Sequence, residues 1–202
     1  DAASKLTEEK YLRFGDLFVN VKNKEKDLDS ATQVKYTLKA AEAFNKAYQL
    51  NSTNAAAIFN VGVIYYNIFG EYDDKVSTNI RTLRSISTAN EEEFAAKKAA
   101  AKTPQAKAAV NKAAADKLNA AQASIKKQNQ DFDVDIQKNI DLSIDALEKA
   151  FAALKDKSEK TKRDNNLLNN CARYLTNLYE IKRNKFRGKD PQKYDMYEAK
   201  YK

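Results

Sequence analysis

Apolar residues along this chain recur at the spacing of amphipathic helices. Ala40, Phe44 and Ala47 stand at i, i+4 and i+7, so they share one helix face on which a large residue lies between two small ones. The polar run from Asn51 to Asn54 predicts a turn, and a new apolar pattern begins at Ile58. We therefore expect two helices that are joined by a tight turn and that allow a neighbouring helix to approach closely at the small residues.

Two apolar spacings, one that opens a helix pair and one that closes it, recur along the sequence. The opening spacing has two large residues, then a small one, then another large one, and it occurs at Ile58, Val61, Gly62 and Tyr65, at Tyr11, Phe14, Gly15 and Phe18, and at Leu168, Cys171, Ala172 and Leu175. The closing spacing of Ala40, Phe44 and Ala47 recurs at Ser143, Leu147 and Ala150. Three helix pairs are therefore predicted, with core positions at Tyr11, Phe14, Phe18, Phe44, Tyr65 and Phe151.

The middle pair is predicted to be much longer than the others, because its opening and closing spacings lie far apart. Thr103-Pro104 interrupts the Ala- and Lys-rich stretch between them, and Pro after a Thr cap both ends one helix and starts the next. An antiparallel pair that turns there places Gly62 opposite Ser143. Further along, the same register pairs Phe94 with Val110 or Asn111, Ile86 with Leu118, and Ile80 with Ile125.

The opening and closing spacings resemble the tetratricopeptide repeat, W-x-x-L-G-x-x-Y followed by A-x-x-x-F and a Pro-containing turn, with Ile58 in the Trp position and Ser52 in the Pro position. The resemblance implies an all-α, right-handed superhelix of antiparallel helical hairpins, one of them elongated into a coiled-coil-like arm. We expect a single domain, 1–202, with repeat one at 5–53, repeat two at 54–160 including an arm at about 75–130, and repeat three or a C-terminal cap at 165–202.

Arrays of this family are usually non-catalytic scaffolds, whose first helices line a concave groove that binds other proteins. Carried over by position, the resemblance implies a groove that is rich in amides, and Asn side chains can both donate to and accept from an extended peptide backbone. Its lining would be Arg13, Asp16, Asn20, Phe59, Asn60, Val63, Tyr66, Asn67, Asn166, Asn169, Asn170, Arg173 and Asn177. A polar, solvent-exposed face is the alternative interpretation of the same residues.

Composition argues against an enzyme or a metalloprotein. The chain has no His and a single Cys, which removes the usual zinc ligand sets and the nucleophiles that depend on His. We expect Cys171 to be a core residue and no cofactor to be bound. The alternating Asp131, Asp133 and Asp135 lack the Gly and Glu of a helix-loop-helix calcium site, so a solvated helix face is expected there.

A formal net charge of +8 raises a second class of function. Cations gather near the end of the chain, interleaved with Tyr194 and Tyr197, and such clusters can bind nucleic acid or anionic lipid or polysaccharide. These cations are Lys182, Arg183, Lys185, Arg187, Lys189 and Lys193. We favour a protein-binding scaffold over this alternative. The sequence does not identify the protein partner.

The longest apolar run, Val61 to Phe69, is too short to span a bilayer. The chain begins at Asp1 without Met or an apolar leader, as a processed or trimmed chain would. Together with its resemblance to exported bacterial tetratricopeptide proteins that have stretched repeats, this favours the cell envelope or periplasm over the cytoplasm.

Overall fold

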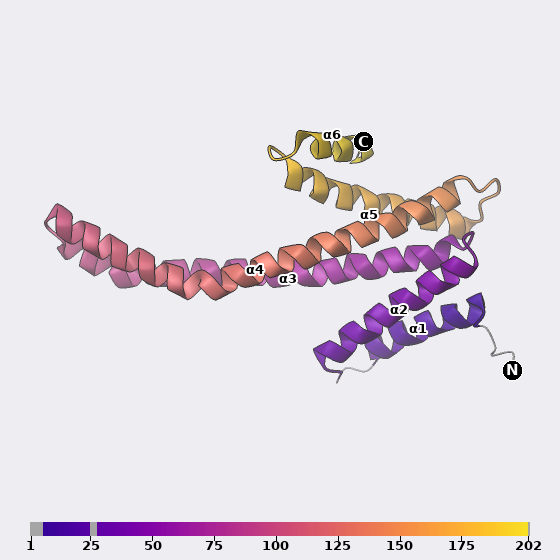
Figure 1. Ribbon diagram of the computed structural model, residues 1–202, viewed down its shortest axis with the longest axis horizontal. Helices are drawn as coiled ribbons and strands as arrows, with labels where there is room; N and C mark the ends of the chain where they lie inside the picture. Colours follow the sequence, from indigo (N-terminus) through magenta and orange to yellow (C-terminus); the bar gives the residue numbers. More distant parts are fainter. Residues whose placement is uncertain (1–5, 25–27, 202) are drawn as a thin grey trace. The chain divides into compact units, whose positions relative to one another are not determined.

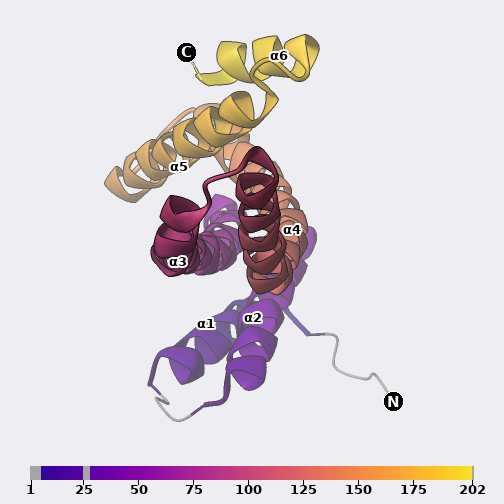
Figure 2. The same ribbon diagram turned by 90° about the vertical axis from the view of Figure 1, so that its left-hand side faces the viewer.

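The chain is all-α in the part that the computed structural model describes, residues 6–24 and 28–201. Six helices cover these residues: α1 (Glu8–Lys24), α2 (Ser30–Leu50), α3 (Ala55–Ala100), α4 (Pro104–Lys155), α5 (Lys162–Phe186) and α6 (Pro191–Tyr201). α1 runs beside α2, α3 beside α4, and α5 beside α6 (Figure 1 and Figure 2). The predicted all-α class and the long antiparallel middle pair are therefore confirmed.

Side-chain caps set where the helices begin. Asp29 Oδ1 accepts a hydrogen bond from the Thr32 N–H at 2.9 Å at the start of α2, and Thr103 Oγ1 accepts one from the Ala106 N–H at 3.1 Å at the start of α4. Asp190 Oδ1 does the same for Lys193 before α6. Pro104 and Pro191 occupy the first helical positions, where the missing N–H has no helical partner to lose.

The chain divides into two compact units. The first, which we call the core unit, comprises 1–68 and 139–202, and the second, the hairpin unit, comprises 69–138. The core unit thus holds α1, α2, α5 and α6 with the beginning of α3 and the end of α4, whereas the hairpin unit holds the rest of α3 and α4.

Two glycines bring helices of the core unit into close contact. A Cβ on Gly15 would lie 2.6 Å from the Phe44 ring, and one on Gly62 would lie 2.6 Å from Leu147 Cγ and 3.3 Å from the Leu147 backbone N. Ser143 Oγ donates a 2.8 Å hydrogen bond to the Gly62 carbonyl. The predicted pairing of Gly62 with Ser143 is therefore confirmed, and the large member of each closing spacing packs on a glycine.

The seam of the hairpin unit is more polar than the sequence predicts. Gln122 is buried and donates to Ser87 Oγ at 2.9 Å and to the Leu83 carbonyl at 3.2 Å, while Asn79 donates to Asn129 at 2.8 Å. Ile80, expected in the seam, is instead 41% exposed. The pattern Val76, Asn79, Leu83, Ile86, Asn90 follows the coiled-coil spacing of three and four residues, and Ile80 falls beside it.

Two residues of the opening spacings lie at the surface. Phe14 is 39% exposed, and Ala172, which occupies the glycine position of the third opening spacing, is exposed as well. α6 has only 11 residues, and its aromatic contacts are with the second half of α5, where Tyr197 stacks on Phe186 at 6.0 Å between ring centroids. No closing helix therefore needs a small residue at Ala172.

Candidate functional site

The core unit contains a cleft of about 440 Å³ between the helices that open the three pairs. α1 contributes Leu12 and Asp16, and α3 contributes Ala56 and Asn60. The third wall is the α4–α5 turn with the first turn of α5. The full lining is Leu12, Asp16, Phe44, Thr53, Asn54, Ala55, Ala56, Ala57, Asn60, Ala153, Leu154, Lys157, Arg163, Asp164 and Leu167.

Apolar packing and one carboxylate hold the first two walls in place. Phe44, Ala57 and Leu154 are almost fully buried beneath the cleft. Glu8 at the start of α1 accepts hydrogen bonds from the side-chain amides of Asn51 at 2.9 Å and Asn54 at 2.6 Å. A single carboxylate thus ties α1 to the α2–α3 turn, which forms part of the rim.

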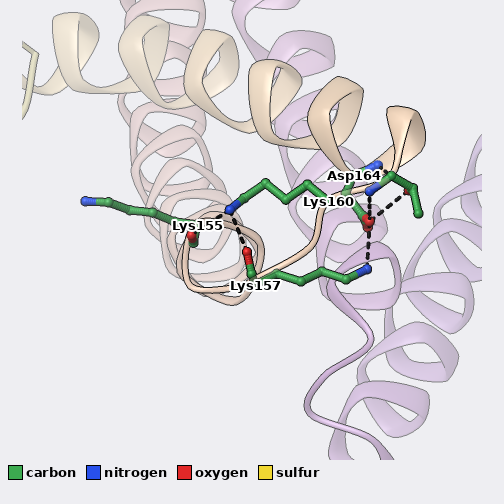
Figure 3. Close-up of polar contacts among 5 residues, drawn as sticks. Lys155, Lys157, Lys160 and Asp164 are labelled. Carbon is green, nitrogen blue, oxygen red and sulfur yellow. Dashed lines mark hydrogen bonds and ion pairs between the residues drawn. The ribbon is translucent and has the colours of Figure 1, made fainter.

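The third wall is built by the α4–α5 turn (Figure 3). Lys160 Nζ donates to the carbonyls of Lys155 at 2.9 Å and Lys157 at 2.7 Å, so it satisfies the last carbonyl of α4 and one carbonyl of the turn that follows. Thr161 and Asp164 form a capping box at the start of α5, in which each side chain accepts from the other residue's backbone N–H. These bonds fix the path of the turn past the cleft.

Asp164 is the most strongly perturbed carboxylate of this wall. Lys157 Nζ donates to Asp164 Oδ2 at 2.6 Å, and the hydroxyl and N–H of Thr161 both donate to the same oxygen at 2.8 Å. The hydrogen bond from Lys157, followed by those from Thr161, lowers the pKa of Asp164 to about 2. Asp164 is therefore ionised at any physiological pH, and its charge is matched by Lys157.

The structure places the predicted groove residues on exposed or half-exposed positions, and it brings some of them together. Asp16 and Asn60 line the cleft. Phe59 and Tyr66 of α3 both contact Tyr174 of α5, at centroid distances of 6.2 and 4.7 Å, and Asn177 donates to the Tyr66 hydroxyl at 3.1 Å. An aromatic contact between α3 and α5 therefore lies among the predicted groove positions.

The remaining predicted groove residues are scattered along the same three helices. Arg13 pairs with Glu9 at 2.6 Å within α1, and Arg173 lies over the Tyr174 ring at 5.5 Å. The others are absent from the cleft lining, and they are Asn20, Val63, Asn67, Asn166, Asn169 and Asn170.

Sequence reasoning missed the residues of the third wall. Lys157, Arg163 and Leu167 line the cleft, but they precede or start α5 and lie outside its opening spacing. The available signal was the cationic run from Lys155 to Arg163, which holds five cations and two acids. A charge run of this kind indicates an exposed turn, and the path of that turn comes from the capping bonds.

Some of the six cations near the end of the chain, Lys182 to Lys193, form ion pairs within the protein. Lys182 is buried and pairs with Asp141 at 2.5 Å, Arg183 pairs with Glu198 at 2.9 Å, and Lys193 pairs with Asp190 at 3.2 Å. Arg183 also lies over the Tyr201 ring at 4.3 Å. Lys182 thus holds α4 to α5 and Arg183 holds α6 to α5, so a smaller share of the cluster's charge faces solvent than the sequence suggests.

Cys171 is packed in the core, and Asp131 and Asp133 of the alternating aspartates form local hydrogen bonds. Cys171 is fully buried, and desolvation raises the pKa of its thiol to about 12. Asp131 accepts from Lys127 at 2.8 Å, and Asp133 from Gln137 at 3.4 Å. Within residues 6–24 and 28–201, no group of three His, Cys, Asp or Glu side chains is arranged to hold a metal ion.

Comparison with known proteins gives no relative: no family model, no curated protein and no solved structure matches this chain. None of the described helices is both long enough and apolar enough to cross a membrane.

Proposed function

We propose that this protein is a non-catalytic, tetratricopeptide-like scaffold that binds a segment of another protein in the core-unit cleft. The observation that supports this proposal is the cleft itself. Its walls come from the opening helices of all three pairs, it holds about 440 Å³, and its lining mixes apolar side chains with a few polar ones. Grooves that bind polypeptides combine these same features, because apolar contact supplies affinity and polar groups fix orientation.

The glycine contacts also support the tetratricopeptide-like assignment. Gly15 against Phe44 and Gly62 against Leu147 repeat one packing arrangement in two successive helix pairs. In each pair a glycine of the opening helix receives the large residue of the closing spacing. Repetition of one contact in consecutive pairs is what an array of repeats would produce.

Ion pairs weaken the basic-surface alternative, because they engage three of the six cations of the cluster near the end of the chain. Lys182, Arg183 and Lys193 are engaged with carboxylates of the same chain, at 2.5 to 3.2 Å. A cation that is already paired contributes less to binding a phosphate or sulfate, since its partner must first be displaced. We therefore propose a protein partner rather than a polyanion.

Affinity capture with matched variants tests the proposal. Wild type, Asn60→Arg and Lys35→Glu are immobilised, and the captured proteins are quantified by mass spectrometry. Asn60 lines the cleft, whereas Lys35 is exposed on α2 outside it. We expect a defined set of proteins to be retained by wild type and Lys35→Glu, to persist in high salt, and to be lost with Asn60→Arg. Retention that both variants preserve, or that salt abolishes, would count against a cleft-bound partner.

A further inference from the structure

Two of the three walls of the cleft carry opposite charges. Asp16 on α1 and Arg163 on α5 both line the cleft and are both exposed. Neither forms an ion pair with any residue that the structure describes. The other two charged residues of the lining, Lys157 and Asp164, pair with each other at 2.6 Å and cancel. The cleft therefore carries an acid on α1 and a base on α5 that are unpaired within the described part of the chain, and its lining also includes the uncharged Ala56, Asn60 and Leu167.

The position of Arg163 is unfavourable for the helix on which it lies. Lys162 and Arg163 are the first two residues of α5, where the helix dipole disfavours cations. The acid of this first turn, Asp164, already accepts from Lys157 and Thr161. The start of the helix therefore does not explain why a cation stands at position 163. Of the two cations in this turn, Arg163 is the one that lines the cleft, and residues that are unfavourable for local structure are expected at binding sites.

We propose that the cleft binds an extended peptide segment in one direction, with an acidic side chain of the segment against Arg163 and a basic side chain against Asp16. This inference rests on the proposed function and adds the polarity of the ligand. A guanidinium can bind a carboxylate through two parallel hydrogen bonds, which fixes orientation as well as charge. Uncharged residues of the segment lie between the two anchors, where the Asn60 amide can donate to and accept from their backbone.

Selection of displayed random peptides tests the polarity. Libraries are selected in parallel on wild type, Arg163→Glu, Asp16→Lys and Lys162→Glu, with a further selection on Arg163→Gln. Lys162 is the matched control, because it is the neighbouring cation on the same helix turn, is exposed, and is absent from the cleft lining. Thermal melting by circular dichroism verifies that every variant remains folded.

The expected result is a pair of opposite charges at a fixed spacing in peptides selected on wild type. Peptides selected on Arg163→Glu should carry a basic residue in place of the acidic one and keep their original basic residue. Peptides selected on Asp16→Lys should carry an acidic residue in place of the basic one and keep their original acidic residue. On Arg163→Gln, the enrichment of the acidic residue should fall at least tenfold, and the enrichment of the basic residue should not change. Lys162→Glu should select the wild-type pattern.

Two failures are distinguishable. If peptides are enriched on wild type without paired charges, or if Lys162→Glu shifts the charge pattern as much as Arg163→Glu, then the cleft binds peptides without the proposed polarity and this inference is overturned. If no peptide is enriched on wild type, the proposed function is wrong and this inference falls with it.

Discussion

Two glycines on α3 provide opposite tests of packing. Gly62 lies against Leu147, so any side chain there meets both the Leu147 side chain and its backbone. We expect Gly62→Leu to lower the free energy of unfolding by about 1 to 3 kcal/mol or more, because the two helices must move apart. Urea unfolding followed by circular dichroism measures the change.

Gly70 is the matched control on the same helix. Nothing lies within 4 Å of a Cβ added there, so Gly70→Ala removes backbone freedom from the unfolded chain without a clash. We expect it to raise the free energy of unfolding by about 0.5 to 1 kcal/mol, since Ala favours a helix interior over Gly. Equal destabilisation by both substitutions would contradict the close contact at Gly62.

Because of Asp164, the stability of the core unit should vary with pH in the acid range. Its pKa is about 2 in the folded chain against an ordinary value of 3.8, so its contribution is complete above pH 3.8 and is lost as the pH falls through about 2. We therefore expect the melting temperature of wild type to exceed that of Asp164→Asn by a constant margin at pH 5 to 6, and this margin to narrow from about pH 4 downwards. A margin that is unchanged at pH 2 would mean that the carboxylate does not hold this turn together.

At the level of elements, local signals predicted the helix starts, and tertiary packing decided the rest. Thr103-Pro104 and Asp190-Pro191 act within one turn of helix, so the sequence is enough to place α4 and α6. The register of α3 against α4 was also predictable, because the turn and the Gly62–Ser143 spacing agree on it. The burial predicted for Ile80 was wrong, because it depends on which side of α3 meets α4. The exposure of Ala172 was not predictable either, because it depends on the length and placement of α6.

The candidate cleft was predictable only in part, for the same reason. Asp16 and Asn60 follow from their positions in the two convincing opening spacings. Arg163 and Lys157 do not, because their side chains reach the cleft only through the particular path of the α4–α5 turn. That path depends on the two hydrogen bonds that Lys160 donates to backbone carbonyls, which no spacing in the sequence specifies. It depends also on the capping box of Thr161 and Asp164, whose T-x-x-D spacing marks the start of α5 but not the course of the turn before it.

The hairpin unit should tolerate shortening without loss of the core unit. Deleting residues 89–99 of α3 together with 107–117 of α4 removes about three turns from each helix, so the remaining faces stay in phase. The native turn and its Thr103 cap remain. The deleted segments contain Phe94 but no Tyr, so we expect unchanged tyrosine bands in near-ultraviolet circular dichroism and an unchanged thermal transition of the core unit.

Hydrogen exchange of the intact chain provides an independent check on the hairpin unit. Ala-rich helices bury little apolar area, so amides near the tip should exchange faster than those around Gly62 and Ala146. If the deletion unfolds the protein, or if tip amides are as protected as those of the core unit, the hairpin unit is not energetically separate.

At the scale of the whole molecule, the central proposal is that a partner polypeptide binds in the cleft lined by α1, α3 and α5. Photo-crosslinking tests it most directly. A photoreactive amino acid is placed at Asn60, within the cleft, or at Lys35, on α2 outside it, and each protein is irradiated in extracts of its native cells. We predict that the Asn60 probe forms discrete crosslinks to specific proteins, that Arg163→Glu reduces their yield, and that the Lys35 probe forms none of them. Crosslinks of equal yield and identity from both positions would contradict the account.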